Sequence, residues 1–266
     1  SHRARMNPAA TFSPPRVVPN LAHAWGGVWR LTFRRFLLPG HWLTLAAGLA
    51  VLALMFLGGV HGRDTDRFLG WAADFYVTLL VPALAFMAGA GAMRDELKSG
   101  TVDYVLTRPV PRPAFVAFKF LAHTICAQLD FLVAFVLVMV LARAIQVPDL
   151  ATIGPKLLLG QVLMITAFSG FGFLCGTITS RYVVIGLVYA GVIEAGVGQI
   201  PTQVSKLSMT HQTRELLGIL LGRLTPEATS PGLAGTTGLI LAFTVVTLAV
   251  AAAIFTWREL TGPADS

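Results

Sequence analysis

The chain is poor in charge. Only 12% of its 266 residues are Asp, Glu, Lys or Arg, about half the share found in soluble domains, whereas 55% are hydrophobic. The mean hydropathy is +0.71. Several apolar runs reach the roughly 18–20 residues that cross a bilayer as a helix, and they are continuous rather than alternating, which argues against a barrel. We therefore predict an all-α integral membrane protein.

Cysteine and the common catalytic motifs are also scarce. Cys126 and Cys175 both lie inside apolar runs, so they are expected to be buried hydrophobes rather than a disulfide or zinc ligands. The sequence contains no Gly-x-x-x-x-Gly-Lys-Ser/Thr, no His-Glu-x-x-His and no Gly-x-Ser-x-Gly. We therefore expect no ATP bound through a P-loop, no resident cofactor or metal, and no enzyme activity from this chain alone.

The apolar runs divide the chain into six expected spans, flanked by short tails. A single domain at 21–258 is expected between a disordered tail at 1–20, rich in Pro and Arg, and a tail at 259–266. Pro82 is expected to kink the second span. The spans are expected at about 42–60, 71–93, 114–142, 155–178, 182–198 and 233–257.

The net charge of +7 is better explained by topology than by nucleic-acid binding, which needs a clustered basic face. Six spans place both ends of the chain on one side of the membrane. That side would then hold thirteen of the 20 Lys and Arg residues. By the positive-inside rule, we expect both termini in the cytoplasm of a multi-pass protein of the inner (cytoplasmic) membrane, with no nucleic-acid partner.

Two amphipathic segments lie outside the spans. Residues 21–38 place Trp25 and Trp29 on an apolar face opposite Arg30 and Arg34, which favours a helix in the membrane surface over one packed against protein. Residues 213–224 carry a leucine face between the fifth and sixth spans. We expect short extracellular helices there, which either dip into the outer leaflet or cap the bundle.

Residues 94–112 form the densest charged segment of the chain. Ser99 is suited to cap a short helix on which Val102, Val105 and Leu106 share one face, and Arg108-Pro109 ends it. A helix of this kind can dock on another protein and pass a push to the two spans that it joins. The alternative is a solvated loop that only links those spans.

The same segment resembles the cytoplasmic signature of type-2 ATP-binding-cassette export permeases. The resemblance rests on Glu96, Gly100-Thr101, Leu106, Pro109-Val110, Arg112 and Lys119. The chain departs from that signature at Val102, Asp103, Val105 and Pro111. The resemblance implies a coupling helix whose contacts with a separate ATPase subunit come from Glu96, Gly100, Thr101, Val102, Asp103, Val105, Leu106, Arg108 and Arg112.

The resemblance also implies the partners and the activity. We expect two ATPase subunits that carry ATP and Mg, a second permease subunit in a homodimer or heterodimer, and ATP-driven export across the bilayer. One alternative is an ATPase-linked membrane subunit for immunity, sensing or complex assembly. Another is an intramembrane enzyme that uses His123, Asp130 and Glu194.

Polar and small residues also recur within the spans. His123, Gln128 and Asp130 lie in the third span and Glu194 lies in the fifth. They predict either a polar or proton-linked path or pairing between helices, and we favour pairing because ATP-driven export needs no proton relay. Small residues four apart predict close helix approach at Gly172 and Gly176, Gly186 and Ala190, and Gly191 and Ala195.

Overall fold

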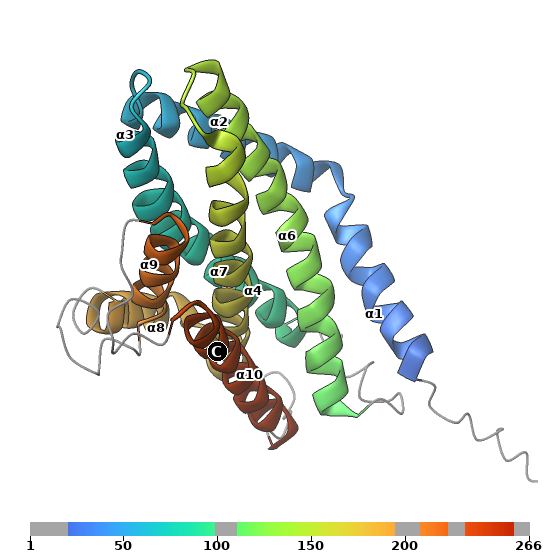
Figure 1. The fold of residues 1–266 in the computed structure, drawn as a ribbon. Coiled ribbons are helices and arrows are strands. Elements are labelled where there is room, and N and C mark those ends of the chain that lie inside the picture. The colour runs from blue at the N-terminus through green and yellow to red at the C-terminus, as the bar shows by residue number, and fades with distance from the viewer. Residues whose placement is uncertain (1–20, 99–110, 195–207, 223–231, 258–266) are drawn as a thin grey trace, which may run out of the picture.

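The protein is described by a computed structural model, which covers residues 21–98, 111–194, 208–222 and 232–257 (Figure 1). Every regular element in these ranges is a helix, in agreement with the predicted all-α fold. Both predicted tails lie outside the described residues. The predicted coupling helix also lies outside them, at 99–110.

In the part of the chain that the structure describes, five helices are long and apolar enough to cross a membrane. They correspond to the first, second, third, fourth and sixth expected spans. The second is one continuous helical path made of α3 (Thr65–Leu69), η1 (Gly70–Leu80) and α4 (Val81–Lys98). The others are α2 (Pro39–Gly59), α6 (Arg112–Ala144), α7 (Leu150–Ile178) and α10 (Gly232–Trp257).

The expected fifth span is shorter than predicted in the part of the chain that is described. It consists of α8 (Tyr182–Val188) and η2 (Tyr189–Glu194). At about 1.5 Å per residue this helix is roughly 20 Å long, whereas the hydrocarbon core of a bilayer is about 30 Å thick. Six full spans are therefore not confirmed, and residues 195–198 lie outside the described ranges.

Helix α7 forms the centre of the bundle. In its most apolar window 67% of the residues are buried, against 11% for α2, which lies at the edge. α7 packs against α4, α6 and α10. In Figure 1, α4 and α10 end in the lower part of the view, where α6 begins, and we call this side the lower end of the molecule. Helices α2 and α6 end at the opposite side, which we call the upper end.

Glycines allow α4 and α7 to touch backbone to backbone. A Cβ added at Gly172 would lie 2.3 Å from the carbonyl oxygen of Phe86, and one at Gly176 would lie 2.5 Å from that of Ala90. The predicted close approach at these two glycines is therefore confirmed, with α4 as the partner helix. A Cβ at Gly186 would meet the Phe86 ring, whereas one at Gly191 would meet nothing within 4 Å.

The two amphipathic helices both pack against the bundle. In α1 (Leu21–Phe36), Trp25 lies 5.4 Å from Phe118 of α6 between ring centroids, and Thr32 is buried. This face of α1 is covered by protein, as in the alternative expectation, and its position relative to a lipid surface stays a prediction. In α9 (Met209–Leu220), the leucine face is buried against α7, where Leu217 adjoins Gly160, so this helix covers the bundle.

The irregularity expected at Pro82 takes the form of π-helical winding. The π-helix η1 ends at Leu80, directly before Val81 and Pro82. Proline has no backbone N–H to donate to the preceding turn, and a local π-helix is one known way for a helix to absorb such a defect. The Thr78 hydroxyl donates a hydrogen bond to the Asp74 carbonyl within this stretch.

We expect Gly172→Ala to destabilise the protein by about 1–3 kcal/mol, because the new methyl group would overlap backbone atoms of α4 that cannot rotate away. Thermal unfolding in detergent micelles measures the effect. Gly48→Ala in α2 is the matched control, since a Cβ there meets nothing within 4 Å, and it is expected to leave stability unchanged or slightly raised. Equal melting temperatures for the two variants would contradict the packing described above.

Candidate functional site

A buried ionic junction lies at the lower end of the molecule, directly before the segment 99–110. Glu96, near the end of α4, is 1% exposed and accepts a hydrogen bond from Lys119 of α6, with 2.8 Å between Nζ and Oε1. Arg35 of α1 lies 3.2 Å from the same oxygen. Lys119 also donates to the Thr32 hydroxyl of α1 at 3.4 Å. One carboxylate therefore joins three helices.

The burial of these charges makes the junction sensitive to loss of a member. Lys119 is 3% exposed, whereas the Arg35 side chain is about half exposed. An isolated buried charge is costly, so the Lys119–Glu96 pair is stable only while both members are present. Arg35 adds a second cation from the more exposed side.

On the other flank of 99–110, Arg112 anchors the start of α6. Its Nη1 donates a 2.8 Å hydrogen bond to the backbone carbonyl of Thr256, close to the end of α10. A cation at a helix C-terminus is favourable because the last carbonyls carry partial negative charge. Phe115 and Phe255 stack beside this contact, with 5.8 Å between ring centroids. Both flanks of 99–110 are thus tied to helices of the bundle.

The structure describes two of the nine predicted ATPase-contact residues. Glu96 points inward to α1 and α6, and Arg112 contacts α10. Contacts of either side chain with a second subunit stay a prediction. The other seven lie outside the described residues: Gly100, Thr101, Val102, Asp103, Val105, Leu106 and Arg108. The Glu96–Lys119 pair was not predicted from the sequence, although a lysine inside a span is itself a signal for a buried acidic partner.

We expect Glu96→Gln to destabilise the protein by about 3–5 kcal/mol, because it leaves Lys119 charged and buried. Lys119→Met should cost less, since Arg35 still neutralises Glu96. The double variant should cost less than the sum of the two. Thermal unfolding in detergent measures all three, with Lys156→Met, half-buried near the upper end, as the control. Strictly additive effects would contradict the pairing.

The polar residues of α6 pair with neighbouring helices. Asp130 lies 3.1 Å from Nε2 of His41, at the start of α2, and both side chains are about one quarter exposed. Gln128 donates to the Val162 carbonyl at 3.0 Å and to the Thr166 hydroxyl at 3.3 Å. These contacts agree with the predicted pairing between helices.

The three residues of the enzyme alternative do not form one site. His123 lies beside the Phe173 ring, 5.7 Å between centroids, and its Nε2 is buried without a hydrogen-bond partner among the described residues. Asp130 contacts α2, and Glu194 contacts the start of α9. Acid–base catalysis needs its groups within hydrogen-bonding reach of a common reacting atom. These contacts therefore give no support to an intramembrane enzyme.

We expect Asp130→Asn to retain most of the stability, because its amide oxygen still accepts from His41. Asp130→Leu should cost about 1 kcal/mol more, since the His41 nitrogen then loses its partner. The difference between the two melting temperatures checks the bond. If the two variants unfold at the same temperature, the contact with His41 contributes nothing to holding α2 on α6.

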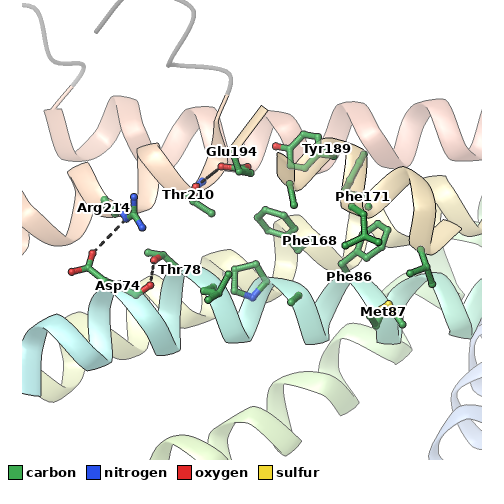
Figure 2. A pocket seen from close by; sticks show the side chains of 17 residues that line it. Asp74, Thr78, Phe86, Met87, Phe168, Phe171, Tyr189, Glu194, Thr210 and Arg214 are labelled. Carbon is green, nitrogen blue, oxygen red and sulfur yellow. Dashed lines mark hydrogen bonds and ion pairs between the residues drawn. The ribbon is translucent and has the colours of Figure 1, made fainter. Parts of the chain in front are cut away.

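A pocket of about 380 Å³ lies between the second span and its neighbouring helices (Figure 2). Its lining residues come from η1 and α4 of that span and from α7, α8, η2 and α9. Its volume is near the lower end of the roughly 300–1,000 Å³ typical of small-molecule sites. The inner part is aromatic, with Phe86, Phe168, Phe171 and Tyr189. These rings pack on one another; Phe171 and Tyr189 are 4.6 Å apart between centroids. The pocket was not predicted from the sequence.

Charged side chains gather at one end of the pocket. Asp74 of η1 and Arg214 of α9 form an exposed ion pair of 3.4 Å, and Figure 2 shows them on the same side as Glu194. Glu194 accepts hydrogen bonds from the hydroxyls of Ser208 and Thr210 and from the backbone N–H groups of Met209 and Thr210. Within the described ranges, the donors on Glu194 are therefore uncharged, and these bonds hold the start of α9 on η2.

The sequence carried a signal for only part of this pocket. Glu194 was a candidate because it is ionisable inside an apolar run. Asp74 also lies in an expected span and was overlooked, and Arg214 lies in a segment expected outside the spans. The pairing of Asp74 with Arg214 depends on where α9 folds back, which no local pattern determines.

The apolar helices of the described ranges indicate a multi-pass membrane protein. The profile of a family described as "ABC-2 family transporter protein" matches residues 35–198, more than half of the chain. The chain belongs to this family of membrane components of ATP-binding-cassette transporters, which implies an ABC ATPase subunit as its partner. Among curated proteins no match is found.

Proposed function

We propose that this chain is the permease subunit of an ATP-driven exporter, in which a separate ATPase subunit supplies the energy. In this proposal two ATPase subunits bind the cytoplasmic face of two permease subunits, and ATP with Mg is held by the ATPases alone. Both termini and residues 94–112 are cytoplasmic, and the protein lies in the inner membrane. The chain itself performs no catalysis.

The observation that carries the proposal is the way both flanks of residues 99–110 are anchored. A push on this segment reaches α4 through the chain and reaches α1 and α6 through Glu96, Lys119 and Arg35. At its other end the push reaches α10 through Arg112. Because the Lys119–Glu96 pair is buried, it resists separation, so displacement of the segment moves several helices together.

The same geometry would also serve an ATPase-linked subunit for immunity, sensing or assembly, because coupling does not require a transported molecule. The pocket between η1, α7 and η2 favours transport, since a purely mechanical subunit has no need of a small-molecule site. Transport of a substrate is therefore the first function to test.

We expect Val105→Asp combined with Leu106→Asp to abolish co-purification of the ATPase subunit and to reduce transport-coupled ATP hydrolysis at least tenfold, because two carboxylates would replace the apolar face predicted to dock. The experiment uses the full chain co-expressed with its ATPase and reconstituted in liposomes. Persistence of both ATPase binding and coupled hydrolysis would show that this segment is not the point of coupling.

The matched control places two new carboxylates at the opposite end of the molecule. Ala151→Asp with Thr152→Asp alters exposed residues in the first turn of α7, where negative charge suits the helix dipole. This variant is expected to bind the ATPase normally. If it also loses the ATPase, the effect of the first pair reflects added charge rather than a lost docking face.

A further inference from the structure

The pocket that Asp74, Phe171 and Glu194 line has exposed apolar side chains around its opening, unlike the opening of a water-filled channel. Leu79, Met87 and Leu187 line it and are 59%, 42% and 68% exposed. These exposed apolar side chains belong to helices that the surrounding bilayer, rather than water, is expected to cover. A molecule therefore reaches this pocket sideways, from the apolar interior of the membrane.

The interior of the pocket accepts an apolar body. Four aromatic rings, the Pro82 ring and the methyl group of Ala83 form its walls. Its volume of about 380 Å³ suits one alkyl chain or one compact ring system. It does not suit the paired acyl chains of a membrane phospholipid, and its apolar walls do not suit a polysaccharide or a metal ion.

The polar end favours a positive charge on the ligand. Two carboxylates, Asp74 and Glu194, face one guanidinium, Arg214, so the formal charge of the lining is −1. Arg214 contacts Asp74 at 3.4 Å, while the donors that Glu194 has among the described residues are neutral. In the low-dielectric surroundings of a bilayer, an ammonium group beside these carboxylates gains more than it would in water.

We propose that this pocket binds a single-chain or compact amphiphilic cation, with its apolar body among Phe86, Phe168 and Phe171 and its charged head between Asp74 and Glu194. The pocket takes this ligand directly from the bilayer. That this ligand is transported rests on the proposed function. That the pocket binds it does not depend on the proposed function.

The test uses the purified full chain in lipid nanodiscs, without ATPase or nucleotide. The probe is a dodecyl trimethylammonium carrying a photoreactive diazirine on its chain, compared with a sulfate and an uncharged maltoside of equal chain length. Mass spectrometry then locates the labelled peptides. We expect the ammonium probe to label residues 74–87 and 183–194 at least fivefold more than the sulfate, and unlabelled ammonium amphiphile to compete.

Substitutions that fill the pocket test its shape. Ala83→Trp and Ala190→Phe start from exposed lining positions on opposite walls, and each is expected to reduce labelling about tenfold. Ala88→Trp is the matched control: Ala88 lies on the same helix as Ala83, is also exposed and is not among the lining residues, so this variant should leave labelling unchanged. Normal labelling of both filled variants, with unchanged melting temperatures, overturns the proposal.

Substitutions at the polar end test the charge. Asp74→Asn should remove most of the preference for ammonium over sulfate, since it also leaves Arg214 unpaired. Asp66→Asn, an exposed acidic residue eight positions earlier, should leave that preference intact. Equal labelling of the wild-type pocket by the sulfate probe contradicts the inference. Stronger labelling by a photoreactive diacyl phospholipid also contradicts it and identifies a resident lipid.

The proposed function is tested separately in liposomes that contain the ATPase. ATP-dependent movement of the ammonium amphiphile, lost in Ala83→Trp and kept in Ala88→Trp, supports both the site and the transport role. Binding in nanodiscs without any ATP-dependent movement keeps the site and overturns its role in export. Movement that persists in Ala83→Trp shows that the transported molecule takes another path.

Discussion

The structure depends on one ion pair, between Glu96 and Lys119, that is buried away from water. Glu96 and Lys119 are almost fully buried and satisfy each other across α4 and α6, and α1 supplies both Arg35 and Thr32 to the same junction. A hydrophobic interface between helices has little specificity in a bilayer, because lipid is as apolar as the side chains. A shared carboxylate therefore fixes the relative position of three helices more firmly than their apolar contacts can.

A second constraint acts on the neighbouring helix pair. Gly172 and Gly176 bring the backbones of α7 and α4 into contact, so these helices leave no space for independent movement. The ionic junction lies at the end of α4 that emerges from this contact. In the proposed mechanism, a displacement of residues 99–110 is thus carried by the closely packed pair α4 and α7, whereas α2, whose most apolar window is 11% buried, lies at the edge of the bundle.

Much of the fold could be predicted from composition and local pattern. Five spans follow from runs of apolar residues, and the close approach of α7 to a partner follows from the spacing of Gly172 and Gly176. The partner itself could not be predicted, because a small-residue pattern does not say which helix fills the gap. The fifth expected span is not confirmed, because its described helix, α8 with η2, ends at Glu194, whose carboxylate contacts the start of α9.

For the site too, single residues could be predicted from the sequence, whereas the contacts between helices could not. Asp130 and Glu194 are noticeable in the sequence because charge is rare in apolar runs, yet His41 and Ser208 became their partners only through the folded arrangement. Family resemblance predicts a partner contact at residues 94–112, and its motif includes Glu96 and Lys119 without indicating that they meet. Long-range pairs of this kind depend on helix order and tilt, which no short window of sequence contains.

The two π-helices give the pocket an unusual evolutionary freedom. η1 carries Asp74 and Thr78, and η2 carries Tyr189 and Glu194, so both carboxylates of the lining belong to segments with i→i+5 hydrogen bonds. Such a segment holds an extra residue relative to an α-helix of the same path. Deleting that residue would restore α-helical winding and turn a different set of side chains toward the ligand, while the helix ends stay in place. Insertions and deletions of one residue, rather than substitutions alone, can therefore change what this pocket recognises.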